Sequence, residues 1–275
     1  NKIQMELPSL IKDPLLSIFV DDLQSVGDLV LSGTFTLEQL SRIIADGKQT
    51  PAYFAENGND LKISHTINLD DMGALLVKHR NPYSVRRPIE HIASRAYSGI
   101  IIDARGNLPV QGEFTSSKVY PCLFPKIYSE DMDLLYERNM VDPVVAKEKN
   151  IVLYESTESK DVLGKRVGRD PLWITARKVY GVNRCDPVIS HDDYLRITTV
   201  PENLELLKQG KVILLLDKDQ LEYAVAAPDK NRRYYLAYQN MKKYFIELTQ
   251  FLSKHLLAFR FQYVTLSSSL ILLSS

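Results

Sequence analysis

Two short apolar runs, each ending on an aspartate, constrain the fold more than any other feature of this sequence. Ile100–Ile102 lead into Asp103, and the run at 211–217 ends on Asp217. Apolar runs of this length, bounded by turn residues, are typical of buried strands. An acid at the end of such a strand serves either as a catalytic carboxylate or as the cap of the following turn. The runs therefore predict two buried strands and leave two roles open for their acids.

Around these runs, strand-like and helix-like patterns are interspersed without a regular β-α-β order. Apolar spacing predicts helices over 36–47 and 68–80, and the Asn57–Gly58 pair predicts a hairpin. The side chains expected to face the core from these helices are Leu37, Leu40, Ile43, Ile44, Leu69, Met72, Leu75 and Leu76. Further expected elements are strands at 28–36, 151–156 and 171–181, and one long helix over 229–258. The sum is an α+β fold with a mixed or antiparallel sheet, packed helices and a long C-terminal helix.

The charge balance argues against a nucleic-acid partner. The 275 residues contain 34 Lys and Arg and 34 Asp and Glu, so the formal net charge is zero. Binding to a phosphate backbone usually requires a basic face, and no basic stripe with interleaved aromatics is present. A neutral chain is also poorly protected against self-association, so we expect a homo-oligomer.

The residues after the first apolar run, Asp103, Arg105 and Gly106, are expected to form a structural turn. Asp103 and Arg105 are separated by one residue, and an ion pair between them would fix the turn after the strand. A catalytic role would need a partner base or nucleophile, which the local sequence does not supply. The turn interpretation is therefore preferred for Asp103, and a capping role is preferred for Asp217.

No metal or cofactor site is predicted. The histidines at positions 65, 79, 91, 191 and 255 show no ligand spacing, and HxH, HExxH and CxxC motifs are absent from the sequence. The "SHDD" stretch at 190–193 is better explained by Ser190 as a helix N-cap, with Asp192 and Asp193 in the first turn. The basic "GKRVGRDP" stretch at 164–171 lacks the order of a phosphate-binding loop, so we expect an exposed, flexible loop there.

The two cysteines, Cys122 and Cys185, leave two alternatives open. Both lie beside prolines that mark turns, and they are too far apart in the sequence for a local metal clip. In an oxidising compartment they could form one structural disulfide. Two unpaired thiols are the preferred alternative.

Aromatic side chains are concentrated in the predicted C-terminal helix and leave apolar surface on more than one side of it. One side would pack on the core, and the other would form an oligomer or partner interface, since Tyr and Phe are favoured there. Core alone and core plus interface are equally supported. The candidate interface residues are Tyr235, Tyr238 and Phe245.

Residues 26–217 contain several distinctive segments in a fixed order, and the most specific are "DARG" at 103–106 and "DPVIS" at 186–190. The order of these segments resembles the LPP20-like family of bacterial envelope lipoproteins, including its FlgP-like, flagellar-associated branch. The resemblance implies an exported protein of envelope assemblies without a defining enzymatic activity or cofactor, and it supports a structural turn at Asp103. The chain lacks the lipidated N-terminal cysteine of the family, and residues 218–275 lie outside the match.

Together these features predict an N-terminal segment (1–25), an α+β region (26–217, with a subdivision near residue 98) and a C-terminal aromatic helix with an apolar tail (218–275). We expect a non-enzymatic structural or assembly protein of the bacterial envelope, periplasmic or outer-membrane-associated, with protein partners. Since no apolar run reaches the ~20 residues of a membrane helix, any anchor would lie in a removed N-terminal segment or be absent. The alternatives are a hydrolase-like enzyme using Asp103 and Asp217, with Arg105 orienting an anionic substrate, and a cell-wall or glycan binder.

Overall fold

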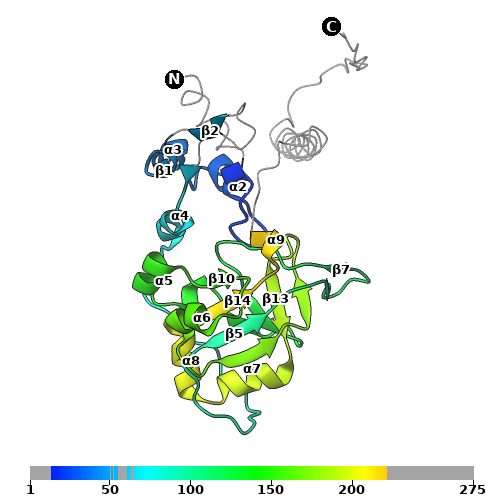
Figure 1. Cartoon of the computed structure of the whole chain (residues 1–275). Coiled ribbons are helices and arrows are strands. Elements are labelled where there is room, and N and C mark those ends of the chain that lie inside the picture. The colour runs from blue at the N-terminus through cyan, green and yellow to red at the C-terminus, as the bar shows by residue number, and fades with distance from the viewer. Residues whose placement is uncertain (1–13, 50, 52, 55–60, 63–64, 222–275) are drawn as a thin grey trace, which may run out of the picture. The chain divides into compact units, whose positions relative to one another are not determined.

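The chain has an α+β fold in which parallel and antiparallel strands are combined with packed helices (Figure 1). The computed structural model describes residues 14–49, 51, 53–54, 61–62 and 65–221. The chain divides into two compact units, 1–223 and 224–275. The predicted helix over 229–258, with Tyr235, Tyr238 and Phe245, lies outside the described residues.

A four-stranded parallel sheet contains both of the apolar runs that end on aspartate. Its strands lie in the order β10 (Leu153–Glu155), β14 (Val212–Leu215), β5 (Ile100–Asp103) and β11 (Leu172–Thr175). All neighbouring pairs are parallel, and Asp103 is in register with both Leu215 and Thr175. The carboxyl ends of the strands therefore meet at one edge of the sheet.

Both faces of this sheet are covered, which explains why its central strands are continuous apolar runs rather than alternating ones. On one face, Ile101, Ile213 and Leu215 pack against Leu163 and Val167 of α6 (Lys160–Val167). On the other face, alternate residues of the same strands join the main core: Ile100, Ile102, Val212 and Leu214. The two runs are therefore buried strands, as expected.

The second sheet is mixed, with strand order β12 (Lys178–Tyr180), β13 (Asp186–Ile189), β8 (Ile127–Ser129) and β9 (Leu134–Tyr136). The β13–β8 pair is parallel, and the two outer pairs are antiparallel.

The prediction of one strand over 171–181 is wrong, because the chain changes sheet in its middle. The backbone N–H of Ala176 donates to Asp103 O in the parallel sheet (2.8 Å), whereas that of Arg177 donates to Val188 O in the mixed sheet (2.7 Å). The β-branched composition of this segment fits both strands, so composition alone could not reveal the break.

The remaining elements flank the sheets. They are α2 (Val26–Leu31), α3 (Leu37–Ala45), β1 (Lys48–Gln49), β2 (Tyr53–Phe54), β3 (Leu61–Lys62), β4 (His65–Thr66), α4 (Leu69–Leu76), β6 (Leu108–Pro109), β7 (Ser116–Ser117), η1 (Arg138–Met140), α5 (Pro143–Lys149), α7 (His191–Thr198), α8 (Pro201–Lys208) and α9 (Lys218–Leu221). The antiparallel β2–β3 pair brackets the predicted Asn57–Gly58 turn. Among the described residues, none of the helices combines the length and the apolar character needed to cross a bilayer.

Two predictions fail because helices form where other structure was expected. The start of the expected strand at 28–36 belongs to α2, which Ser25 and Asp28 cap reciprocally: the Asp28 N–H donates to Ser25 Oγ (3.2 Å) and the Ser25 N–H donates to Asp28 Oδ2 (2.9 Å). The expected flexible loop at 164–171 begins inside α6, whose buried Leu163 and Val167 anchor it to the sheet.

The helices expected near 36–47 and 68–80 are α3 and α4, with shorter buried faces than predicted. In α3 the buried side chains are Leu40, Ile43 and Ile44, while Leu37 in the first turn is 51% exposed. In α4, Met72 and Leu76 are buried, and Leu69 and Leu75 are exposed.

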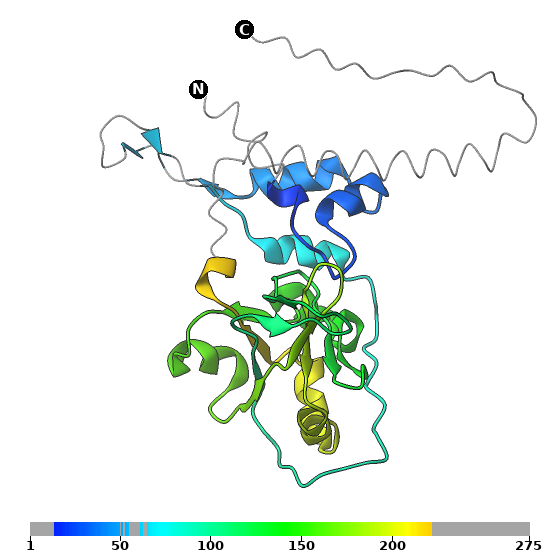
Figure 2. The ribbon, with the colours of Figure 1, turned by 90° about the vertical axis from the view of Figure 1, so that its right-hand side faces the viewer.

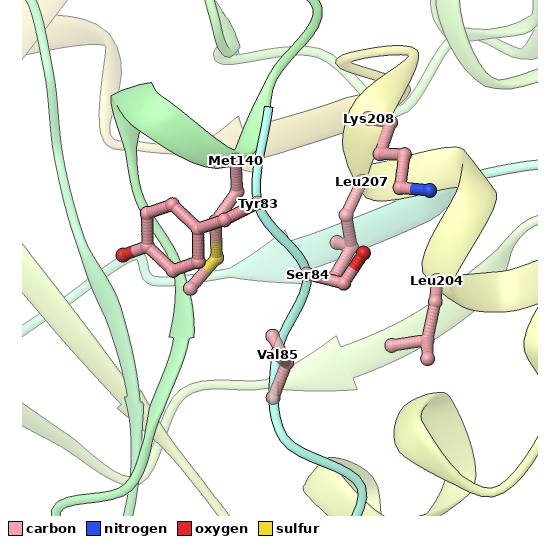
Figure 3. A pocket seen from close by; sticks show the side chains of 7 residues that line it. All are labelled: Tyr83, Ser84, Val85, Met140, Leu204, Leu207 and Lys208. Carbon is pink, nitrogen blue, oxygen red and sulfur yellow. The ribbon is translucent and has the colours of Figure 1, made fainter. Parts of the chain in front are cut away.

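A long segment without helix or strand, residues 77–99, connects α4 to β5 (Figure 2). We call it the strap. Backbone and side-chain hydrogen bonds fix both of its ends: Tyr83 N–H donates to Asn139 O (3.1 Å), and Tyr97 N–H donates to Asn203 Oδ1 (3.0 Å). A small space lies where the strap crosses α8 (Figure 3). Its volume is about 10 Å³, which is enough for about one water molecule. It is lined by Tyr83, Ser84, Val85, Met140, Leu204, Leu207 and Lys208.

Candidate functional site

The carboxyl edge of the parallel sheet brings together the two strand-terminal acids that the sequence singled out. Asp103 closes β5, and Asp217 follows the neighbouring strand β14 by two residues. Their side chains are 28% and 30% exposed, so both are within reach of solvent. In open parallel sheets, this edge is where ligands bind.

Asp103 is held by Arg105 through a two-pronged ion pair. Arg105 Nε donates to Asp103 Oδ1 (2.8 Å) and Nη2 donates to Oδ2 (2.5 Å), while the Arg105 backbone N–H also donates to Oδ1 (3.2 Å). The same guanidinium reaches Glu158 Oε1 (2.6 Å). The hydrogen bonds from the Arg105 side chain hold the pKa of Asp103 below its ordinary value, because they stabilise the ionised carboxylate.

Asp217 is fixed by the turn that follows Asp103. The backbone N–H of Gly106 donates to Asp217 Oδ2 (3.0 Å). Gly106 has a φ of 79°, in the left-handed region that favours glycine, and this conformation is part of the turn. Lys118 Nζ lies 3.3 Å from Asp217 Oδ2 and 2.9 Å from Asp219 Oδ2, and hydrogen bonds to these acids, Asp219 first, raise the pKa of Lys118.

The contacts of Asp103 stabilise its ionised carboxylate rather than preparing a proton transfer. A general acid or base that works near neutral pH needs a carboxyl pKa raised toward 7, whereas that of Asp103 is lowered. Arg105, the group that would orient an anionic substrate, is bound to Asp103 and Glu158. Within the described part of the chain, no cluster of three or more His, Cys, Asp or Glu side chains could hold a metal ion.

Ser190 is the N-cap of α7. Its Oγ accepts a hydrogen bond from the Asp193 N–H (3.1 Å) and donates to Asp193 Oδ2 (2.6 Å). The next residue, His191, lies between two acids, with Nδ1 2.7 Å from Asp131 Oδ2 and Nε2 3.3 Å from Glu90 Oε2. The "SHDD" stretch therefore starts a helix and ties it to the strap.

Cys122 and Cys185 are free, buried thiols, and Cys122 is near enough to be the largest influence on the pKa of Cys185. They belong to a second group of titratable side chains. This group also includes Asp186 of β13 and Tyr154 of β10. Burial is the main cause that raises the pKa of Asp186 to about 7, and the neighbouring Asp22 acts in the same direction.

Sequence reasoning missed several of the side chains that complete these sites: Lys118, Glu158, Tyr154, Asp186 and Asp22. Glu158 and Lys118 reach their partners across 53 and 101 residues, respectively. Contacts at such separations leave no local pattern, so no signal in a single sequence could have found them.

Comparisons with known proteins find family-model matches for two stretches of the chain. Residues 99–218 match the family model of the second domain of Treponema pallidum Tp0624, and residues 1–75 match the model of its N-terminal domain. None of the curated proteins matches the chain. The second-domain match begins just before β5 and ends just after β14, so it contains both four-stranded sheets. Neither match is to the LPP20-like family, and that resemblance stays a prediction. Over these two stretches the chain is similar to the N-terminal and second domains of Tp0624, a bacterial protein.

Proposed function

We propose that this chain is a non-enzymatic structural protein of the bacterial cell envelope that acts by binding other proteins and copies of itself. The family-model matches name a bacterial protein, and the "DARG" and "DPVIS" segments resemble envelope lipoproteins. The observation that carries the proposal is the state of the sheet edge: Arg105 engages Asp103 and Glu158 at 2.5–2.8 Å. This network fixes a turn, and it uses the groups that a catalytic site would leave free for substrate.

Exposed apolar side chains provide contact surface for such a role. Phe114, between β6 and β7, is fully exposed (112%), and Figure 1 shows this hairpin projecting from the strands around it. Ile89 in the strap (98%) and Val182 after β12 (73%) are likewise exposed. Trp173 is 46% exposed on β11, an edge strand of its sheet. Large apolar and aromatic side chains of this kind dominate the binding energy of protein interfaces.

The finer proposal is a periplasmic or outer-membrane-associated location, at the flagellar motor or another envelope complex, and a homo-oligomeric state. It rests on the resemblance to the LPP20-like family and on the aromatic residues Tyr235, Tyr238 and Phe245. Detection of the full-length gene product in the periplasmic or outer-membrane fraction of its bacterium tests the location. Recovery in the cytosolic fraction alone would contradict it.

Light scattering on the full chain tests the assembly. We expect a concentration-dependent multimer whose mass falls when Tyr235, Tyr238 and Phe245 are replaced together by Ser, with an unchanged thermal unfolding midpoint. Phe114→Ser is a second probe on the described surface. Equal losses of assembly and of thermal stability would mean that the aromatic residues are core, and a monomer at every concentration would rule out self-assembly.

A hydrolase is the second candidate, because the fold places Asp103 and Asp217 at one edge and leaves each about 30% exposed. Assays with chromogenic ester, phosphate and glycoside substrates test this candidate. It requires turnover by the wild type that Asp103→Asn and Asp217→Asn abolish. Turnover that survives both substitutions would come from another source.

A further inference from the structure

The cluster around the two cysteines is the unusual part of the core, because it places two thiols in contact although they come from distant segments. Cys122 is 5% exposed and Cys185 is fully buried. Cys122 lies in the extended segment that leads into β8, and Cys185 immediately precedes β13. The two thiols are neighbours, and Cys122 is the largest influence on the pKa of the Cys185 thiol.

Hydrogen bonds from backbone N–H groups on either side of the cysteines hold these two segments side by side. On one side, Tyr120 N–H donates to Arg184 O (2.8 Å). On the other, Lys126 N–H donates to Asp186 Oδ1 (2.8 Å). Beyond this point the segments continue as the parallel pair of β8 and β13. The approach of the thiols is therefore a consequence of the sheet, and not of one side-chain rotamer.

A third segment, residues 19–22, fixes both cysteine-bearing segments from the N-terminal part of the chain. Leu123 N–H donates to Phe19 O (3.0 Å). Asn183 N–H donates to Asp22, at both the backbone O and Oδ1 (3.1 Å each). The residues next to Cys122 and close to Cys185 therefore share one neighbour, which limits how far the two segments can separate.

The Cys122 backbone is also held by a half-buried tyrosine on β10, Tyr154. The Tyr154 hydroxyl donates to Cys122 O (3.0 Å) and accepts from the Cys122 N–H (3.1 Å), and it lies 4.0 Å from Cys122 Sγ. The Cys185 thiol points toward Asn183 O at 3.4 Å. Both cysteines are thus positioned by their surroundings before any bond forms between them.

We propose that Cys122 and Cys185 are a redox-active pair that a disulfide oxidant, either a small molecule or an exported thiol–disulfide oxidoreductase, converts into an intramolecular disulfide. The Cys122 thiolate attacks one sulfur of the oxidant and releases the other as a thiolate. The Cys185 thiolate then attacks the Cys122 sulfur and releases the second oxidant thiolate. The protein loses two protons and two electrons, and the oxidant is reduced to two thiols.

The new bond joins the segment before β8 to the start of β13 and closes a loop of roughly 60 residues, a length at which a disulfide restricts the unfolded chain substantially. The oxidised protein is thereby stabilised in a compartment where disulfides persist, and the reduced form belongs to a reducing one. The chemistry depends only on the two thiols, so this proposal stands or fails independently of the proposed function.

The surroundings make the exchange slow. The contact with Cys122, the main cause, together with burial raises the pKa of the Cys185 thiol, and the carboxylates of Asp186 and Asp22 act in the same direction. Because the thiolate is the attacking species, we expect oxidation to accelerate with rising pH and to require local opening of the segment around Cys122.

The test is oxidation of the full-length, natively folded chain with oxidised glutathione, followed by thiol counting in denaturant, mass spectrometry and thermal unfolding. We expect both thiols to disappear, a mass lower by two hydrogens, a peptide that cross-links residues 122 and 185, and a midpoint raised by roughly 10 °C. Dithiothreitol should reverse all of these changes.

The single substitutions Cys122→Ser and Cys185→Ser provide the matched controls. Each should give at most a glutathione adduct, without the rise in midpoint. Thiols that survive oxidant in the folded wild type but react in denaturant would overturn the proposal, as would cross-linking between chains. A disulfide that forms without a rise in midpoint would show that the native geometry does not accept the bond. These measurements on the wild type remain decisive even if a variant fails to fold.

Discussion

The backbone N–H of Gly106 donates to the carboxylate of Asp217, 3.0 Å away, across 111 residues of sequence. This bond joins the turn after β5 to the end of β14, the strand beside it. It explains why two acids that look equivalent in the sequence differ in their partners: Asp103 is bound by its own turn, and Asp217 by the turn of the neighbouring strand.

Replacing Asp217 by Ala should lower the free energy of unfolding by about 1–2 kcal/mol, because the Gly106 N–H and the Lys118 ammonium lose their common acceptor. Urea denaturation at neutral pH measures this loss. Asp219→Ala is the matched control, since it removes an acid that also contacts Lys118 but is 69% exposed; we expect no measurable change there. Equal losses in the two variants would mean that Asp217 contributes only through Lys118.

The Asp103–Arg105 pair should make the fold sensitive to acid. The pKa of Asp103 is lowered in the folded chain, so its contribution to stability is present above the unfolded value of ~3.9 and is lost as the pH falls through the folded one. Urea midpoints between pH 6 and pH 3 should therefore fall more steeply for the wild type than for Asp103→Asn. Parallel curves would show that the pair contributes nothing to the acid sensitivity.

Asp186 should change the pH dependence of stability in the opposite direction from Asp103. Its folded pKa is about 7, far above the ~3.9 of an unfolded chain, so between these values the folded state binds more protons and stability falls as the pH rises. Asp186→Asn keeps an oxygen acceptor for the Lys126 N–H and removes the titration. Its stability relative to the wild type should increase from pH 4 to pH 7, by on the order of 3 kcal/mol, and then level off.

Carbon-detected NMR titration of the Asp186 carboxyl provides a direct check. In Asp22→Asn the pKa of Asp186 should fall, because a neighbouring negative charge is removed. An unperturbed titration near pH 4 in the wild type would contradict both predictions.

Two glycine substitutions should change the free energy of unfolding in opposite directions. At Gly99, which precedes β5, a Cβ would lie 2.3 Å from Val167 Cβ and 2.6 Å from its Cα. Gly99→Ala should therefore cost at least about 2 kcal/mol, since α6 must move off the sheet. At Gly164, within α6, an added Cβ would have no heavy atom within 4 Å outside its own helix backbone and chain neighbours. Gly164→Ala should stabilise the chain by about 0.5–1 kcal/mol through helix propensity, as chemical denaturation of the two variants would show.

The strands that the sequence predicts best are those whose apolar side chains are buried on both faces of the sheet. β5 and β14 are buried on both faces, and their short apolar runs, bounded by turn residues, therefore predicted strands. The segment at 171–181 shows the limit of this reasoning. Its change of sheet at Ala176 depends on the carbonyls of Asp103 and Val188, which the chain supplies far from that point.

The failures at α2 and α6 have different causes. At α2, the capping pair Ser25 and Asp28 was visible in the sequence, but the β-branched and apolar residues that follow it favoured a strand. In α6, the glycine and the basic residues concealed a helix whose burial depends on Leu163 and Val167 alone. The side chains around Cys122 and Cys185 could not be grouped at all, because the pairing of β8 with β13 and contacts from β10 and residues 19–22 bring them together.

The hydrogen bonds of residues 19–22 have a consequence for how the chain is made. Asp22 leaves the ribosome early, but its partner Asn183 is synthesised 161 residues later. At a translation rate of about 5–20 residues per second, this delay is roughly 8–30 s. During that time the N-terminal segment cannot complete its native contacts, and the strand β5 also waits for β14. The native contacts of residues 19–22 and of β5 therefore form late, after most of the described part of the chain has been synthesised.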